Sequence, residues 1–127
     1  LLGKYQSHRA KKIKNINILK NDCYKVLSMV SYMGTYNLEE ANNWFQLAIN
    51  SLNLKKINII PKKEVTYKDF KNSLIKINQL KESDKKFFFR SCIDMVLIDS
   101  KVKVEENEIL RFIAEVIEVP MPNLVHF

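Results

Sequence analysis

The stretch IDSKVKVEENEILRFIAEVIEVPMP, residues 98–122, predicts a helix with a defined start and a defined stop. Its apolar residues recur at the three- and four-residue spacing of a buried helix face. The residues on this face are Ile109, Leu110, Phe112, Ile113, Val116 and Ile117. Pro120 and Pro122 end the pattern, because proline lacks the N–H that a helix interior needs. We therefore expect a helix that begins near Val104 and ends before Pro120.

Four carboxylates lie at the start of this stretch, at Asp99, Glu105, Glu106 and Glu108. Carboxylates in a first turn stabilise a helix by about 0.3–1 kcal/mol each, because the unpaired N–H groups there carry partial positive charge. If Lys103 is the N-cap, the Glu106 side chain can accept a bond from its N–H, as one half of a capping box. The spacing therefore favours a helix start. No nucleophile, base or electrophile accompanies the carboxylates, so we predict no catalytic residue here.

The alternative for the same carboxylates is a divalent metal site made by Asp99 and Glu106. A calcium loop starting at Asp99 would need oxygen ligands at alternating positions. The chain instead has Lys101 and Lys103 there, and their ammonium groups would repel a cation. The metal site is therefore the secondary hypothesis, and a structural role the primary one.

The composition of the whole chain favours helices. The 127 residues are 46% apolar and 28% charged, which is ordinary for a globular domain. Only two glycines and three prolines are present, whereas sheets and tight hairpins use these residues at their turns. No run of about 18 uncharged apolar residues occurs, so no membrane-spanning helix is predicted.

Four more helices are expected upstream, in segments 21–34, 38–54, 67–80 and 84–98. Asn37, Thr66 and Ser83 are good N-cap residues for the last three of them. The segment that follows Ser83 carries apolar residues on several sides, so we expect it to be the central helix.

An internal repeat appears when the chain is compared with itself at an offset of 66 positions. Gly34 then aligns with Ser100, and Leu38 aligns with Val104. We predict an all-α fold, a single compact bundle of five to seven helices built from two similar helical hairpins. Residues 1–20 form a basic lead-in, and residues 21–127 form the helical domain.

Cysteine, histidine and motif content argue against an enzyme in this chain. Cys23 and Cys92 lie in apolar helical patterns, and His8 and His126 lie at opposite ends of the sequence. No HExxH, zinc-ligand cluster, P-loop or GxSxG motif occurs. We therefore expect no catalytic residue and no cofactor.

The net charge of +7 raises the hypothesis of a basic module that binds nucleic acid or anionic lipid. The cations are almost all lysine, and arginine, the better reader of bases and phosphates, occurs only three times. The sequence therefore argues against nucleic acid, and it does not specify an oligomeric state.

Residues 91–124, SCIDMVLIDSKVKVEENEILRFIAEVIEVPMPNL, resemble the TerB-like helical domain of tellurite-resistance proteins. They are most similar to the version at the C-terminus of membrane-anchored HtpX-like zinc metallopeptidases. The matching residues are Asp99, Val102, Glu106, Glu108, Leu110, Arg111, Ile113, Ala114, Glu115, Pro120, Met121, Pro122 and Leu124. The stretch 33–52 resembles the earlier hairpin of that domain. Ser100, Lys103 and Asn123 depart from the pattern, in place of a glycine, a cap residue and a proline.

This resemblance implies a non-catalytic accessory or interaction domain at the C-terminus of a bacterial metallopeptidase. The zinc and the protease activity would then belong to the parent protein. The domain would lie on the cytoplasmic side of the inner membrane, and its partner would be the protease domain or another protein. The resemblance also allows a free-standing TerB-like protein that binds a divalent metal through Asp99 and Glu106 in a stress or tellurite response.

Overall fold

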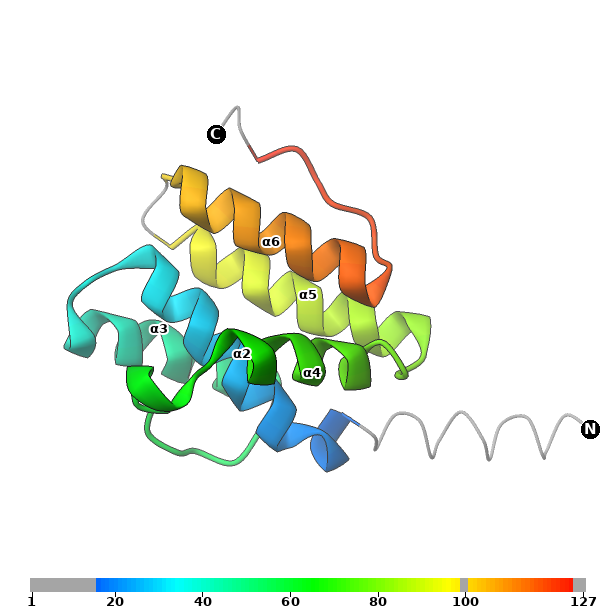
Figure 1. The fold of residues 1–127 in the computed structure, drawn as a ribbon, viewed down its shortest axis with the longest axis horizontal. Helices are drawn as coiled ribbons and strands as arrows, with labels where there is room; N and C mark the ends of the chain where they lie inside the picture. Colours follow the sequence, from blue (N-terminus) through cyan, green and yellow to red (C-terminus); the bar gives the residue numbers. More distant parts are fainter. Residues whose placement is uncertain (1–15, 99–100, 125–127) are drawn as a thin grey trace, which may run out of the picture.

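The computed structural model describes residues 16–98 and 101–124, and this part of the chain is a bundle of α-helices without a strand. It confirms the predicted all-α fold (Figure 1). The helices are α2 (Lys20–Gly34), α3 (Leu38–Ser51), α4 (Tyr67–Ile77), α5 (Glu82–Val96) and α6 (Val104–Ile117), with a 3-10 turn, η1 (Lys62–Glu64).

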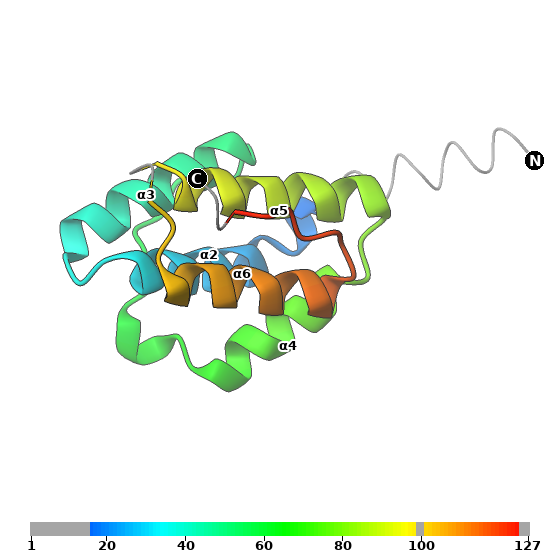
Figure 2. The ribbon, with the colours of Figure 1, turned by 90° about the horizontal axis from the view of Figure 1, so that it is seen from above.

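The central helix is α2, which packs against α3, α4, α5 and α6. In Figure 2, α3 and α5 lie on one side of α2, and α4 and α6 lie on the other. The prediction that the helix after Ser83 is central was wrong, since α5 keeps one exposed face that includes Phe87. Neighbours can approach α2 closely because several of its buried residues are small, namely Cys23, Ser28, Ser31 and Gly34.

The helix starts follow the sequence signals in three cases. The side chain of Asn37 accepts from the N–H of Glu40 at 2.9 Å, and Thr66 Oγ1 accepts from the N–H of Asp69 at 3.1 Å. The last helix starts at Val104, as expected. These bonds satisfy N–H groups that the first turn leaves without a partner.

The expected cap at Ser83 was wrong, because α5 begins at Glu82, two residues before the expected first residue, Asp84. The Lys81 carbonyl accepts from the N–H groups of Asp84 and Lys85, at 3.1 and 3.0 Å. The first turn therefore closes before a Ser83 cap could form.

The internal repeat corresponds to matching helices. α3 and α6 each contain 14 residues, and their first and last residues are 66 positions apart. α2 and α5 each contain 15 residues, but α5 ends at Val96, 62 positions after Gly34. The connection between the helices of the second hairpin is therefore four residues longer than that of the first.

The connector between α3 and α4 is extended and is held by side chains. Tyr24 and Tyr32 of α2 each donate a hydroxyl bond of 2.5 Å to a carbonyl of segment 55–60. Ser28 Oγ accepts from an N–H of the same segment at 3.2 Å. Further bonds to this segment come from two α3 residues, Asn42 and Gln46. Backbone groups that have no ladder partner are thus satisfied.

Candidate functional site

Two connections meet at one end of the bundle, the turn after α2 and the connection before α6. The Lys103 ammonium donates to the Gly34 carbonyl at 2.5 Å and so joins them. A lysine has no acceptor for a helix N–H, so Lys103 cannot complete the capping box with its side chain. It instead caps the C-terminal end of a neighbouring helix, where carbonyls lack partners and a positive charge is favourable.

Gly34 lies in close contact with two buried side chains. A Cβ placed on Gly34 would lie 2.5 Å from Trp44 Cζ3 and 2.8 Å from Glu106 Oε2. Both contacts are closer than real Cβ atoms show, so only glycine fits here without movement. The backbone of Gly34 does not have a positive φ, so glycine is required by the close approach and not by the turn conformation.

Glu106 is buried, with 1% of its surface exposed. One carboxylate oxygen accepts from the Lys103 N–H at 3.0 Å, as the sequence predicted. The other oxygen faces Gly34. Its predicted partner in a metal site, Asp99, lies outside the described residues, so that pairing stays a prediction. Within residues 16–98 and 101–124, no group of three or more His, Cys, Asp or Glu side chains is arranged to hold a metal.

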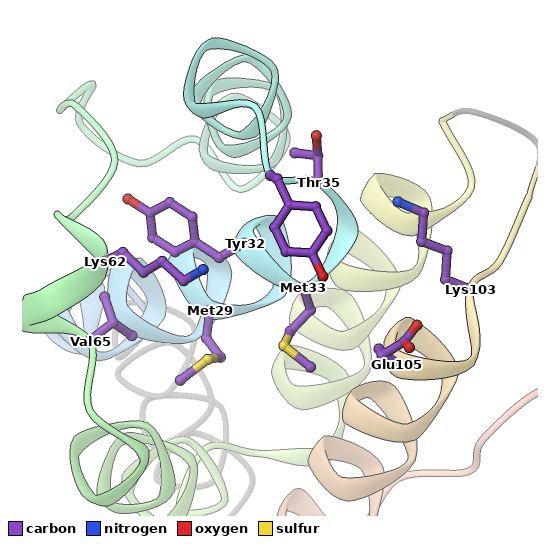
Figure 3. Close-up of a pocket in the computed structure, with 9 residues that line it drawn as sticks. Met29, Tyr32, Met33, Thr35, Lys62, Val65, Lys103 and Glu105 are labelled. Carbon is purple, nitrogen blue, oxygen red and sulfur yellow. The ribbon is translucent and has the colours of Figure 1, made fainter.

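A groove of about 560 Å³ lies beside this junction, between α2, η1 and the start of α6 (Figure 3). Its lining is mainly apolar and consists of Met29, Tyr32, Met33, Thr35, Tyr36, Lys62, Val65, Lys103 and Glu105. Figure 3 shows Met29 and Met33 on the same side of the groove, with Lys62 and Glu105 on opposite sides of them. Methionine side chains adapt to differently shaped partners, which suits a binding surface.

Large apolar side chains are exposed around the groove. Tyr36 is 99% exposed, and Met33, inside the groove, is 38% exposed. Leu38 and Val104, the first residues of α3 and α6, are 64% and 69% exposed. These two residues occupy equivalent positions in the internal repeat. We call the groove and these four residues the turn-end surface.

Of the two lysines that line the groove, only one has an ammonium group that is not already bound to a backbone carbonyl of the described residues. The Lys103 ammonium is bound to the Gly34 carbonyl. The Lys62 ammonium lies 5.9 Å from the centre of the Tyr36 ring and, in the described part of the chain, makes no ion pair. Lys62 is therefore the cation that can meet an anionic group in this groove, next to an aromatic ring.

The cysteines are not candidates for chemistry. Cys23 and Cys92 are fully buried and reduced. Burial raises the pKa of Cys23 to about 12, and it raises the pKa of Cys92 as well. Thiols of this kind are protonated at neutral pH and are poor nucleophiles. His8 and His126 lie outside the described residues.

The chain matches no protein-family profile, no curated protein sequence and no solved structure. The resemblance to TerB-like domains therefore stays a prediction. No helix in the described ranges has the length and hydrophobicity needed to cross a membrane.

Proposed function

We propose that this chain is a non-catalytic interaction domain that holds a partner polypeptide at its turn-end surface. The observation that carries this proposal is the groove of about 560 Å³ with an almost fully exposed Tyr36 above it. Soluble domains seldom expose clustered large apolar side chains unless those side chains bind something. Tyrosine and methionine are also enriched in the centres of protein interfaces.

The chemistry of the groove defines the partner segment. The apolar floor at Met29 and Met33 would accept an aliphatic or aromatic side chain. The Lys62 ammonium would form an ion pair with a carboxylate next to that side chain, which gives charge complementarity on this side of the groove. The preferred segment therefore carries a large apolar residue beside an aspartate or glutamate.

A narrower proposal is that the domain belongs to the C-terminus of a membrane-anchored zinc metallopeptidase. The likeness of residues 91–124 to TerB-like domains supports it. The coding sequence upstream of Leu1 tests it directly. An HExxH motif with apolar spans is expected, and a start codon immediately before Leu1 would rule the proposal out.

The groove itself is tested with peptides selected from a random library against the purified 127-residue chain. Selected peptides should share the apolar-acidic pattern, and their affinity is then measured on two double variants. Met33→Gln with Tyr36→Ser should weaken binding by about 30-fold or more, as loss of a buried tyrosine anchor does. The matched control, Leu47→Gln with Phe87→Ser, removes exposed apolar side chains from α3 and α5 and should leave affinity unchanged.

Two results would refute the groove as the binding site. One is a selection that yields no peptide with measurable affinity. The other is a set of peptides whose binding falls equally in both double variants.

A further inference from the structure

A second surface, on α4, has a different chemistry. α4 lies at the edge of the bundle and packs mainly on α2 and α6 (Figure 2). Its buried residues are Phe70, Ser73, Leu74 and Ile77. The opposite side faces solvent along the whole length of the helix, about 16 Å for 11 residues.

The outer side of α4 combines lysines with exposed apolar groups. Lys68, Lys71 and Lys76 are exposed, and Ile75 lies among them at 48% exposure. Tyr67, at the start of the helix, is 62% exposed. Helical spacing places Lys68 and Ile75 on the outermost line, with Lys71 and Lys76 on either side. We call these five residues the α4 face.

Positive charge on the α4 face is only partly compensated, since α4 holds one acid, Asp69, against Lys68, Lys71 and Lys76. Within residues 16–98 and 101–124, the ion pair of this face joins the Lys76 ammonium to Asp22 at 3.9 Å, and the Lys76 side chain is still 60% exposed. The segment before the helix adds Lys62 and Lys63, both exposed, against a single exposed acid, Glu64. Such a surface attracts anions through charge alone.

We propose that the α4 face docks on an anionic membrane surface. The lysines would lie among the negatively charged head groups, and Ile75 would enter the boundary of the acyl chains. Long lysine stems allow this arrangement, because the charged ends stay in the polar layer while the stems cover apolar groups. The proposal rests on the exposed side of α4, and Lys62, which also lines the partner groove, adds only to the positive charge before the helix.

Nucleic acid is the other polyanion that a lysine-rich surface could bind. The α4 face contains no arginine, the residue that pairs best with phosphate and base edges. An aliphatic side chain at the centre of the surface contributes to contact with lipid but not to contact with a phosphate backbone. These two features favour the membrane.

The test uses vesicles of phosphatidylcholine with and without about 30% phosphatidylserine, a strongly anionic composition. The 127-residue chain should sediment with the anionic vesicles only, and about 0.5 M salt should release it. The triple variant Lys68→Gln, Lys71→Gln, Lys76→Gln should bind about a hundredfold more weakly, at about fivefold per lysine. The matched control, Lys56→Gln, Lys86→Gln, Arg90→Gln, loses the same charge elsewhere and should bind like the parent.

Insertion of Ile75 is measured with Ile75→Cys labelled with an environment-sensitive fluorophore. Labelling is specific because Cys23 and Cys92 are fully buried. The emission should shift to the blue on anionic vesicles. Circular dichroism and thermal unfolding verify that each variant is folded.

Four outcomes would overturn the proposal. They are the absence of sedimentation with anionic vesicles, an equal loss of binding in the two triple variants, an unshifted fluorophore, and tighter binding to single-stranded or duplex nucleic acid than to the vesicles.

Discussion

Replacing Gly34 with alanine should destabilise the fold, although the same change usually stabilises a helix. Alanine commonly gains about 0.5–1 kcal/mol over glycine in a helix, because glycine loses more backbone entropy on folding. At Gly34, however, the new methyl group would lie 2.5 Å from Trp44 Cζ3 and 2.8 Å from Glu106 Oε2. Trp44 and Glu106 are 8% and 1% exposed, so neither can move into solvent freely.

The expected loss follows from two contributions. Overpacking a well-filled core costs about 1–3 kcal/mol. Displacement of the Glu106 carboxylate from the Lys103 N–H adds about 1–3 kcal/mol, the cost of a buried polar group that loses its bond. After the usual gain for alanine, we expect a net loss of about 1–5 kcal/mol in the free energy of unfolding, centred on about 3 kcal/mol.

Urea unfolding followed by circular dichroism at 222 nm measures this loss. In a chain of 127 residues it should lower the melting temperature by about 10 °C. A cycle with Trp44→Phe isolates the clash with the indole ring, because phenylalanine lacks the Cζ3 position. The double variant should be more stable than the sum of the single losses predicts. A Gly34→Ala chain as stable as the parent, or more stable, would refute the packing argument.

Three further experiments test other parts of the structure. Cys23 and Cys92 should resist a thiol reagent at pH 8 in the folded chain and react within minutes in urea, and rapid reaction of the folded chain would contradict their burial. Burial raises the pKa of Asp84 above its ordinary 3.8, and its buried Oδ2 atom has no hydrogen-bond partner among the residues that the structure describes. The folded chain therefore binds this proton more tightly than the unfolded chain, and stability falls as pH rises from 3.8 through the raised folded value. Asp84→Asn should remove that slope. Between pH 3 and pH 7, the melting temperature of the variant should therefore rise relative to that of the parent. An equal difference in melting temperature at the two pH values would contradict the argument. Tyr32→Phe should cost about 1–2 kcal/mol by leaving a connector carbonyl unpaired, while Tyr36→Phe, at an exposed position, should cost nothing in urea unfolding.

Much of the fold is predictable from the sequence because its helix starts are local signals. Asn37 and Thr66 bond the N–H three residues ahead, and this depends only on residues within one turn. The start of α6 and the bond from the Lys103 N–H to Glu106 were predicted for the same reason. Ser83 has the same local signal, but the chain there closes its first turn from the Lys81 carbonyl.

The central position of α2 was not predictable, since it depends on contacts between distant segments. Ser28 and Ser31 look like exposed polar residues in the sequence, yet both are fully buried. Ser31 bonds to Met95, and Ser28 bonds to the connector after α3. The regular four-residue spacing of Tyr24, Ser28 and Tyr32 is the one sequence signal that could have revealed a segment lying along this helix.

The turn-end surface was missed for a related reason. Lys62 and Tyr36 are 26 positions apart in the sequence, and only the fold brings the ammonium to 5.9 Å from the ring centre. Met33 and Tyr36 lie next to a turn glycine, so their apolar character resembles ordinary core packing. In this region the sequence predicted the bond from the Lys103 N–H to the Glu106 carboxylate, and that bond stabilises the start of α6.

The most direct test of the proposed interaction domain is a chemical-shift map. A peptide selected for binding is added to the ¹⁵N-labelled 127-residue chain, and backbone amide shifts are followed by NMR. We predict that the largest changes fall on Met33, Thr35, Tyr36, Lys62 and Glu105, around the groove. Changes concentrated instead on the exposed side of α3, at Asn43, Leu47 and Asn50, would contradict the central claim.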